Sequence, residues 1–325
     1  MHSILTPIRR SLNDELGQYE ITFRQIMASN VKLVDRIAKY IVRRKGKGLR
    51  PLLVIMSAKI LGKPNRNTYI VASLVEILHT ATLVHDDVVD DANIRRNFPS
   101  INAIWKNKVS VLMGDYLLAK SLISATETGS LQIMNILAET AKRLSKGELF
   151  QIEKSRRLNI TESEYYQLIS DKTAALISAC CELGALTVEA NNRDREALGA
   201  YGESIGLAFQ IKDDLLDYQS SAPILGKPVG SDLKEKKITL PLILALKKAP
   251  ENEGKAVIKL LKNGVDNNEI KKIVRFCEKY DGIKNAEFKA FELAERAKSN
   301  IDYLPDSLEK ENARKFVDYI VNRKK

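Results

Sequence analysis

The sequence is poor in cysteine and aromatic residues. Three of its 325 residues are cysteines, and phenylalanine, tryptophan and tyrosine together make up 6%. Cys180 and Cys181 are adjacent and Cys277 is distant, so neither a disulfide framework nor a Cys-x-x-Cys metal site is present. This scarcity excludes a disulfide-stabilised secreted scaffold and fits a reducing cytoplasm.

Long apolar runs are also absent. No stretch approaches the roughly 20 apolar residues of a membrane-spanning helix. The first ten residues contain no uninterrupted apolar segment like that of a secretory signal. We therefore expect a soluble, cytoplasmic protein that contacts a membrane at most peripherally.

Apolar residues recur with helical rather than alternating spacing. Val71, Leu74, Val75 and Leu78 share one helix face, and hydrophobic residues make up 44% of the chain. No Ser/Gly/Pro-rich or highly charged stretch divides the sequence. These patterns predict an all-α protein with a single domain over residues 1–325, in which prolines and glycines separate roughly a dozen helices.

The chain is basic, with 52 Lys and Arg against 41 Asp and Glu, a formal net charge of +11. This bias favours anionic partners such as diphosphates, nucleic acid or acidic lipids. Most of the cations are expected on solvated helix faces. No recognised nucleic-acid-binding motif is present, so we expect no nucleic acid partner.

Two acidic boxes of the form Asp-Asp-x-x-Asp resemble each other. In each box the first and last aspartates are four residues apart, which places them on one helix face. Carboxylates so placed repel one another unless a cation neutralises them, and hard oxygen ligands favour Mg²⁺. The candidate metal ligands are Asp86, Asp87, Asp90, Asp213, Asp214 and Asp217.

Basic segments accompany these boxes. Arg95 and Arg96 follow the first box, and guanidinium groups suit bidentate phosphate contacts. A basic, glycine-bearing turn at 43–51 leads into a predicted helix and could present cations and backbone N–H groups to a phosphate. The segment 219–237 lacks helical periodicity and contains several lysines, so we interpret it as a flexible flap.

The order and spacing of these segments resemble the trans-isoprenyl diphosphate synthases, in particular their long-chain branch typified by octaprenyl diphosphate synthase. The similarity spans nearly the whole chain. Its motifs are Gly46-Lys47-Gly48-Leu49-Arg50-Pro51, Glu76 to Thr82, Asp86 to Arg96, Gly114-Asp115, Asp171-Lys172-Thr173, Phe209 to Asp217, and Gly226 to Leu233.

The resemblance implies a large helical bundle of the isoprenoid synthase type with a central substrate cavity, usually homodimeric. It implies that the six aspartates hold three Mg²⁺ ions on an allylic diphosphate, to which isopentenyl diphosphate is added. Arg95, Lys172, Lys227 and Lys237 would bind the allylic diphosphate. Lys47, Arg50, His79 and Arg96 would bind isopentenyl diphosphate, and Thr173 and Gln210 would line the reaction centre. The expected catalytic residues are Asp86, Asp87, Asp90, Lys172, Thr173, Gln210 and Asp213.

The sequence departs from the family pattern at two positions. Gly48 stands where a second basic residue is usual, and Lys236 replaces a glycine in the flap. These changes bear on the affinity for isopentenyl diphosphate and on the flap conformation. Asp115 is open to two interpretations, as an orienting neighbour of the first box or as a helix cap.

Product length is expected to depend on the helix before the first box. Ala81 and Thr82 lie roughly 6–7.5 Å of helical rise below Asp86, and short-chain relatives typically carry an aromatic ring there. Small residues should leave a tunnel open to a floor near Ala125 and Leu137. The sequence therefore favours a long all-trans polyprenyl product made from a farnesyl or geranylgeranyl starter.

Other functions stay open at this point. A short-chain farnesyl or geranylgeranyl diphosphate synthase would share every motif except the small residues below the box. A terpene cyclase would not need cations for a second diphosphate, and a non-catalytic partner subunit would be expected to have degraded aspartate boxes.

Overall fold

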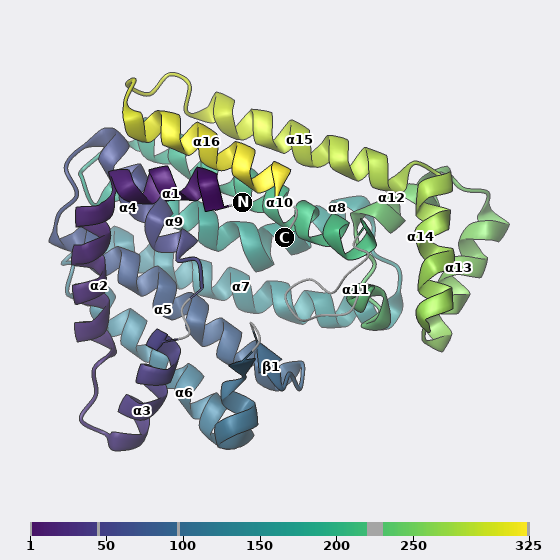
Figure 1. Cartoon of the computed structure of the whole chain (residues 1–325), viewed down its shortest axis with the longest axis horizontal. Coiled ribbons are helices and arrows are strands. Elements are labelled where there is room, and N and C mark those ends of the chain that lie inside the picture. Colours follow the sequence, from purple (N-terminus) through teal and green to yellow (C-terminus); the bar gives the residue numbers. More distant parts are fainter. Residues whose placement is uncertain (1, 44–45, 96–97, 220–229, 324–325) are drawn as a thin grey trace. The chain divides into compact units, whose positions relative to one another are not determined.

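A computed structural model describes residues 2–43, 46–95, 98–219 and 230–323 (Figure 1). The chain is almost entirely helical, which confirms the all-α prediction. The helices are α1 (His2–Ser11), α2 (Asn13–Met27), α3 (Lys32–Arg43), α4 (Leu49–Leu61), α5 (Arg66–Val89), α6 (Ile101–Thr126), α7 (Leu131–Arg157), α8 (Glu162–Ile169), α9 (Ala175–Leu186), α10 (Asn192–Gln219), α11 (Ser231–Lys234), α12 (Leu240–Lys248), α13 (Glu251–Asn263), α14 (Asn267–Lys279), α15 (Gly282–Asn300) and α16 (Leu308–Asn322).

The remaining elements are a π-helical turn and a small hairpin. The turn is Ser170–Ala174, between α8 and α9. Strands β1 (Ile94–Arg95) and β2 (Phe98–Pro99) pair antiparallel. The helices outnumber the predicted dozen because short elements such as α11 leave little periodic signal in a sequence.

Capping interactions begin several helices. Thr161 with Glu164 starts α8, and Asp266 with Glu269 starts α14. In each case the cap side chain accepts a hydrogen bond from a backbone N–H of the first turn, and the glutamate carboxylate accepts one from the backbone N–H of the cap residue.

The described residues form two compact units. Unit 1 comprises residues 1–142, 176–202 and 300–316, and unit 2 comprises 143–175, 203–299 and 317–325. A single domain over 1–325 stays a prediction. Of the predicted flap at 219–237, residues 220–229 lie outside the described residues, while 231–234 form helix α11.

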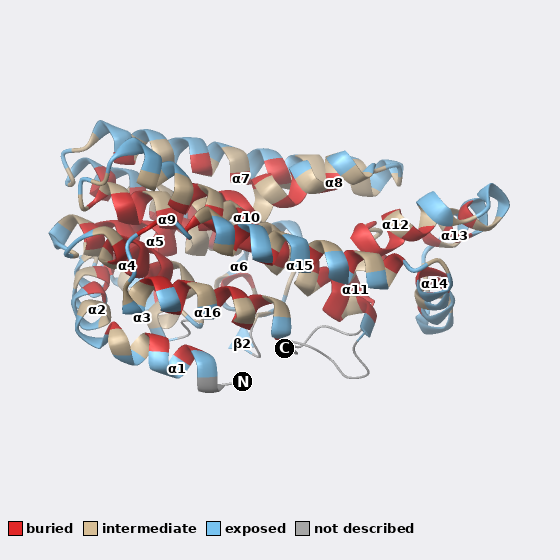
Figure 2. Cartoon of the chain, turned by 90° about the horizontal axis from the view of Figure 1, so that it is seen from above, coloured by how far each residue is buried: buried red, intermediate tan, exposed pale blue. Residues whose placement is uncertain are grey.

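Helix α5 is the central helix of unit 1. It packs along α6 and also contacts α2 and α4 (Figure 1). Residues Val71, Leu74 and Val75 on its predicted stripe are fully buried, and Figure 2 shows the buried residues concentrated on α4, α5 and α9. Among the described residues α5 alone is long and apolar enough to cross a membrane, but 67% of its most apolar window is buried within the protein. Its apolar character is therefore that of a core helix.

The core of unit 2 surrounds the C-terminal half of α10. Ile211, Leu215 and Tyr218 pack with residues of α8, α11, α12, α13, α14 and α15. The hydroxyl of Thr239 donates to the buried hydroxyl of Tyr218 over 3.2 Å. This packing fixes the helix that carries the second aspartate box.

Candidate active site

The first aspartate box ends helix α5. Asp86 is half-buried, Asp87 is 3% exposed, and Asp90 is the exposed C-cap residue. Consecutive helix positions point about 100° apart. Asp87 therefore faces the interior, whereas Asp86 and Asp90 share another face.

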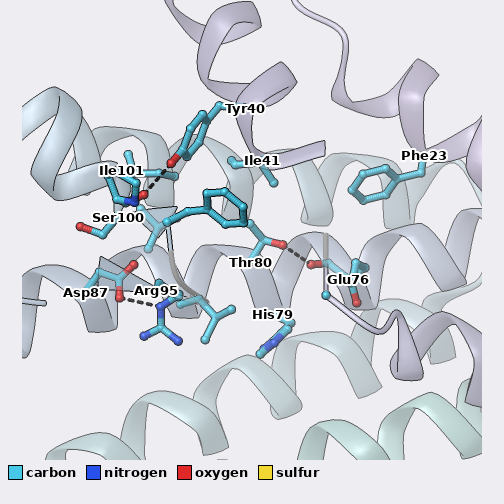
Figure 3. A pocket seen from close by; sticks show the side chains of 15 residues that line it. Phe23, Tyr40, Ile41, Glu76, His79, Thr80, Asp87, Arg95, Ser100 and Ile101 are labelled. Atoms are coloured by element: carbon cyan, nitrogen blue, oxygen red, sulfur yellow. Dashed lines mark hydrogen bonds and ion pairs between the residues drawn. The ribbon is translucent and has the colours of Figure 1, made fainter. Parts of the chain in front are cut away.

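Asp87 is held by the arginine that follows the box. Arg95 on β1 places its Nε 2.6 Å from Asp87 Oδ1 (Figure 3). Burial raises the pKa of Asp87 above its ordinary value, and the Arg95 guanidinium opposes that rise. This pair ties the hairpin to the end of α5. Arg96, the other predicted arginine, lies outside the described residues.

The side chain of His85, the residue before the box, packs against Gly114 and Asp115 on α6. His85 Nε2 is 3.3 Å from Asp115 Oδ1 and 3.2 Å from the Val111 carbonyl oxygen. A Cβ on Gly114 would lie 2.2 Å from the His85 ring. The glycine makes room for the imidazole, and Asp115 contacts a neighbour of Asp86, which favours its interpretation as an orienting residue.

A pocket in unit 1 brings several predicted binding residues together. His79 and Arg95 lie in its wall with Gly46, while Phe98 and Ile101 contribute apolar surface (Figure 3). The basic turn continues from Gly46 through exposed Lys47 to half-buried Arg50 in the first turn of α4. Cations from 47–50 thus adjoin the pocket that contains His79.

The π-helical turn of unit 2 carries Lys172 and Thr173. Lys172 Nζ lies 2.6 Å from Glu148 Oε2 and donates to Gln151 Oε1 over 3.0 Å, both on α7. The preceding Asp171 is buried and bound by Arg143 Nε at 2.9 Å. Burial opposes ionisation of Asp171, but Arg143 and Gln167 hold its pKa below the ordinary value. Contacts of Asp171 and of Lys172 itself therefore hold the turn in place.

Two glycines allow this widened turn to pack closely. A Cβ on Gly147 of α7 would lie 2.8 Å from the Lys172 backbone nitrogen. A Cβ on Gly206 of α10 would lie 2.5 Å from Ala174 Cα. Neither helix could approach the turn so closely with a side chain at these positions.

A chain of hydrogen bonds joins the turn to the second aspartate box. Thr173 Oγ1 donates to Gln210 Oε1 over 2.8 Å, and Gln210 Nε2 donates to Asp214 Oδ1 over 2.8 Å. The Tyr165 hydroxyl donates to Asp214 Oδ2 over 2.7 Å. Asp214 is 3% exposed, and burial raises its pKa well above the ordinary value. Thr173 and Gln210, predicted to lie at one reaction centre, are thus in direct contact.

The other aspartates of the second box have different surroundings. Asp217 accepts bonds from the backbone N–H groups of Gly230, Ser231 and Asp232 at 3.1–3.2 Å, so it fixes the start of α11. Asp213 forms an ion pair with Arg323 beyond α16. The Arg323 guanidinium also lies 3.8 Å from the centroid of the Phe209 ring.

The remaining predicted residues fall in several places. Lys237 pairs with Glu235, and Lys227 lies outside the described residues. Ala81 is 2% exposed, whereas Thr82 is half-buried and its hydroxyl donates to the His79 carbonyl. Ala125 and Leu137, the predicted tunnel floor, are both buried.

The donor chemistry of the boxes suits a hard divalent cation. Within the described part of the chain, no group of three or more His, Cys, Asp or Glu side chains is close enough to hold a metal. Asp87, Asp214 and Asp217 are already bonded to protein donors. Asp213 is paired with Arg323. All six aspartates supply carboxylate oxygens, the ligands that Mg²⁺ prefers, so both boxes fit the expected metal.

Comparison with known proteins identifies the family. Residues 31–277 match the family model described as polyprenyl synthetase. The chain belongs to the polyprenyl synthetase family. This finding confirms the resemblance noted from the motifs.

Individual relatives cover nearly the whole chain. It is 32% identical over 292 residues to a short chain isoprenyl diphosphate synthase from Methanothermobacter thermautotrophicus, covering 89% of this chain and 90% of the relative. It is 32% identical over 279 residues to the octaprenyl diphosphate synthase of Escherichia coli, covering 86% of each. A polyprenyl synthase structure from Caulobacter crescentus, complexed with calcium and isoprenyl diphosphate, superposes with a TM-score of 0.90 at 31% identity, covering 98% of this chain and 97% of that one. The chain is thus a prenyltransferase of isoprenoid synthase fold.

Several residues of this polyprenyl synthetase site were missed from the sequence. Glu148 and Gln151 hold Lys172, Tyr165 holds Asp214, and Arg323 pairs with Asp213. Glu148 and Gln151 follow Gly147 on one helix face, a pattern that could have indicated a functional face of α7. Nothing near Tyr165 or Arg323 in the sequence indicated their partners.

Proposed function

We propose that this chain synthesises a long all-trans polyprenyl diphosphate by adding isopentenyl diphosphate to an allylic diphosphate such as farnesyl or geranylgeranyl diphosphate. The observation that carries the proposal is the presence of two cationic groups, one in each unit. Lys172 precedes Thr173, which is bonded through Gln210 to Asp214 of the second aspartate box. Lys47 and Arg50 belong to the basic turn, whose Gly46 lines the same pocket as His79. Two diphosphates need two such groups.

The six aspartates of the two boxes are proposed as the metal donors. Asp87 and Asp213 are paired with arginines, and Asp214 and Asp217 accept hydrogen bonds from protein groups, so metal binding would exchange some of these partners. Three Mg²⁺ ions are expected with substrate bound. When bound, Mg²⁺ would neutralise charge on the allylic diphosphate and so make it a better leaving group.

The allylic site is proposed to contain Lys172 and Arg95, with Lys227 and Lys237 contributing from the flap. Their positive charges stabilise the diphosphate as the carbon–oxygen bond breaks and the electron pair leaves with oxygen. Glu148 and Gln151 keep the Lys172 ammonium in one position before substrate arrives. The allylic carbocation then lies near Thr173 and Gln210.

The second substrate is proposed to bind Lys47, Arg50, His79 and Arg96 through its diphosphate. The double bond of isopentenyl diphosphate supplies the electron pair for the new carbon–carbon bond. Loss of a proton from the adjacent carbon restores a double bond, and the released diphosphate accepts that proton. No protein nucleophile is needed, so the residues supply binding, orientation and exclusion of water.

A homodimer is proposed from an apolar face of α6. Val111, Leu112, Leu122 and Ile123 lie on one side of this helix and are 40–61% exposed. An apolar stripe of this kind marks an interaction surface more often than a solvated face. Leu112→Glu with Ile123→Glu should convert a dimer in sedimentation equilibrium into a monomer; unchanged mass would exclude this face.

The protein is proposed to work in the cytoplasm, with peripheral membrane contact for release of its apolar product. The three cysteines are buried as free thiols, in keeping with a reducing compartment. Cell fractionation should place the protein in the supernatant after an alkaline carbonate wash. Retention in the membrane pellet would contradict peripheral association.

One assay separates the candidate functions. Purified protein is incubated with Mg²⁺, farnesyl diphosphate and labelled isopentenyl diphosphate, and the products are resolved by length. Products beyond geranylgeranyl length are expected, and Asp213→Ala should abolish them. Products that stop at geranylgeranyl length would identify a short-chain synthase. A hydrocarbon formed without isopentenyl diphosphate would identify a cyclase, and no turnover would indicate a partner subunit.

A further inference from the structure

Helix α1 places an arginine on the basic turn. Arg9 Nη2 donates to the carbonyl oxygen of Lys47, and it lies 3.5 Å from the point that a Cβ on Gly48 would occupy. All of these residues belong to unit 1. A cation from a helix 38 residues earlier in the sequence thus lies within the segment that carries Lys47 and Arg50.

Packing holds Arg9 at this position. Ile8 and Leu12, on either side of it in the sequence, are completely buried. Asn312 Nδ2 donates to Ser11 Oγ over 3.0 Å, and Lys59 Nζ donates to the Ser11 carbonyl over 3.3 Å. The helix is therefore anchored by contacts that do not involve the guanidinium, and substitution of Arg9 should leave its position unchanged.

Gly48 creates the space that Arg9 uses. Its φ of +54° is left-handed, a conformation that glycine adopts without steric cost. A long side chain at 48 would extend toward the Arg9 guanidinium, because even its Cβ would be in van der Waals contact there. The absence of a side chain at Gly48 therefore allows the Arg9 guanidinium to occupy this space.

We propose that Arg9 is a further diphosphate-binding residue, which acts with Lys47 and Arg50 and supplies the positive charge that Gly48 cannot. A guanidinium carries five N–H donors, and the contact with Lys47 uses one nitrogen of the group. The ligand is the diphosphate of the second substrate, so the assignment rests on the proposed function. Arg9 also positions Lys47 by binding its carbonyl oxygen.

The first test uses inorganic diphosphate and calorimetric titration in EDTA, so that divalent metal does not contribute. Arg9→Gln should weaken diphosphate binding by about tenfold, because a charge-assisted hydrogen bond is lost. Arg10→Gln is the matched control: it removes the same charge from an exposed position on the same helix. Equal effects of the two substitutions, within twofold, would overturn the proposal.

A second test restores a positive charge at position 48 in protein that lacks the Arg9 guanidinium. Gly48→Arg and Gly48→Ala, each combined with Arg9→Gln, carry the same left-handed backbone strain. The arginine should recover diphosphate affinity relative to the alanine, which a role for Arg9 in anchoring α1 would not explain. Equal affinity of the two double variants would count against a cation site at this point.

Wild-type protein gives an independent readout. Diphosphate should protect Arg9, but not Arg10, from modification by phenylglyoxal, measured by peptide mass spectrometry. Unprotected Arg9 would overturn the proposal even if Arg9→Gln did not fold.

In the condensation assay, Arg9→Gln should raise KM for isopentenyl diphosphate more than for the allylic substrate. If Arg9 contributes to diphosphate binding but the protein catalyses no condensation, only the proposed function is refuted. If the protein catalyses condensation but Arg9→Gln changes neither diphosphate binding nor KM, only this inference is refuted.

Discussion

Lys236 has a backbone conformation that favours glycine. Its φ is +59°, at the position where the family pattern has glycine. Its side chain donates to the Lys262 carbonyl over 3.0 Å on the surface, which offsets part of the strain. The departure noted from the sequence is therefore a strained residue next to α11.

Lys236→Gly should raise the free energy of unfolding by about 0.5–1 kcal/mol. Relief of left-handed strain contributes about 1–2 kcal/mol, and the greater entropy of glycine in the unfolded chain removes part of it. Lys236→Ala is the control, because it removes the same hydrogen bond but keeps the strain. Denaturant unfolding in which the glycine variant is no more stable than the alanine variant would contradict this account.

Asp214 should make stability depend on pH. Its pKa is raised in the folded protein, so its favourable contribution is complete below the unfolded pKa and is lost as pH rises through the folded pKa. Asp214→Asn does not titrate. From about pH 4 upward the variant should therefore gain stability relative to wild type, by up to about 1.4 kcal/mol per pH unit. Urea unfolding in EDTA at several pH values measures this difference, and parallel profiles would contradict it.

The close approach of α7 and α10 to the π-helical turn fixes Lys172 and Thr173. Glycine at 147 and 206 is required by geometry. The sequence predicted the residues of the turn but not its form, because α- and π-helical segments have similar residue spacing over five positions. The contacts of Glu148, Gln151 and Arg323 depend on tertiary packing, which sequence periodicity does not report.

Gly206→Ala should destabilise the protein by about 1–3 kcal/mol and lower kcat, since the added Cβ must displace the turn at Ala174. Gly199→Ala on the same helix is the control. Its Cβ would meet side-chain atoms no closer than 3.7 Å, so it should stabilise α10 by about 0.5–1 kcal/mol. Thermal unfolding compares the two variants. Similar effects would show that the turn tolerates a side chain.

Arg323→Gln should change how the protein responds to Mg²⁺. Without metal, loss of the pair with Asp213, of the hydrogen bond to the Phe209 carbonyl and of the contact with the Phe209 ring should lower the free energy of unfolding by about 1–3 kcal/mol. With Mg²⁺ and inorganic diphosphate, the variant should gain more thermal stability than wild type, because no guanidinium competes for Asp213. Arg314→Gln, on α16 and paired with Asp302, is the control. Equal increases in unfolding temperature on addition of Mg²⁺ and diphosphate in both variants would exclude competition between Arg323 and the metal for Asp213.

Across the chain, hydrophobic periodicity was enough to predict the all-α class and the central helix α5. It also placed Asp86 and Asp90 on one face. The sequence alone could not show that Asp87 is buried against Arg95, because α5 has apolar residues on all its faces before the box and so does not indicate which aspartate points inward. It also could not show that Asp217 fixes α11, since that role depends on the position of a distant segment.

Ala81→Phe should shorten the product. Ala81 is 2% exposed on α5, and a ring there would fill the space proposed for the growing chain. Condensation should continue but stop mainly at farnesyl or geranylgeranyl length, resolved by chromatography after circular dichroism has confirmed the fold. Unchanged product length in a soluble, active variant would contradict the tunnel.

One chain is expected to join several isopentenyl units to one allylic starter, and double labelling measures this stoichiometry. Purified protein is given tritiated farnesyl diphosphate and carbon-14 isopentenyl diphosphate with Mg²⁺, and the molar ratio of the labels is measured in the isolated product. We expect several isopentenyl units per starter in the product, and none incorporated by Asp86→Ala. A product that contains the starter label alone, or no product from the intact protein, would contradict it.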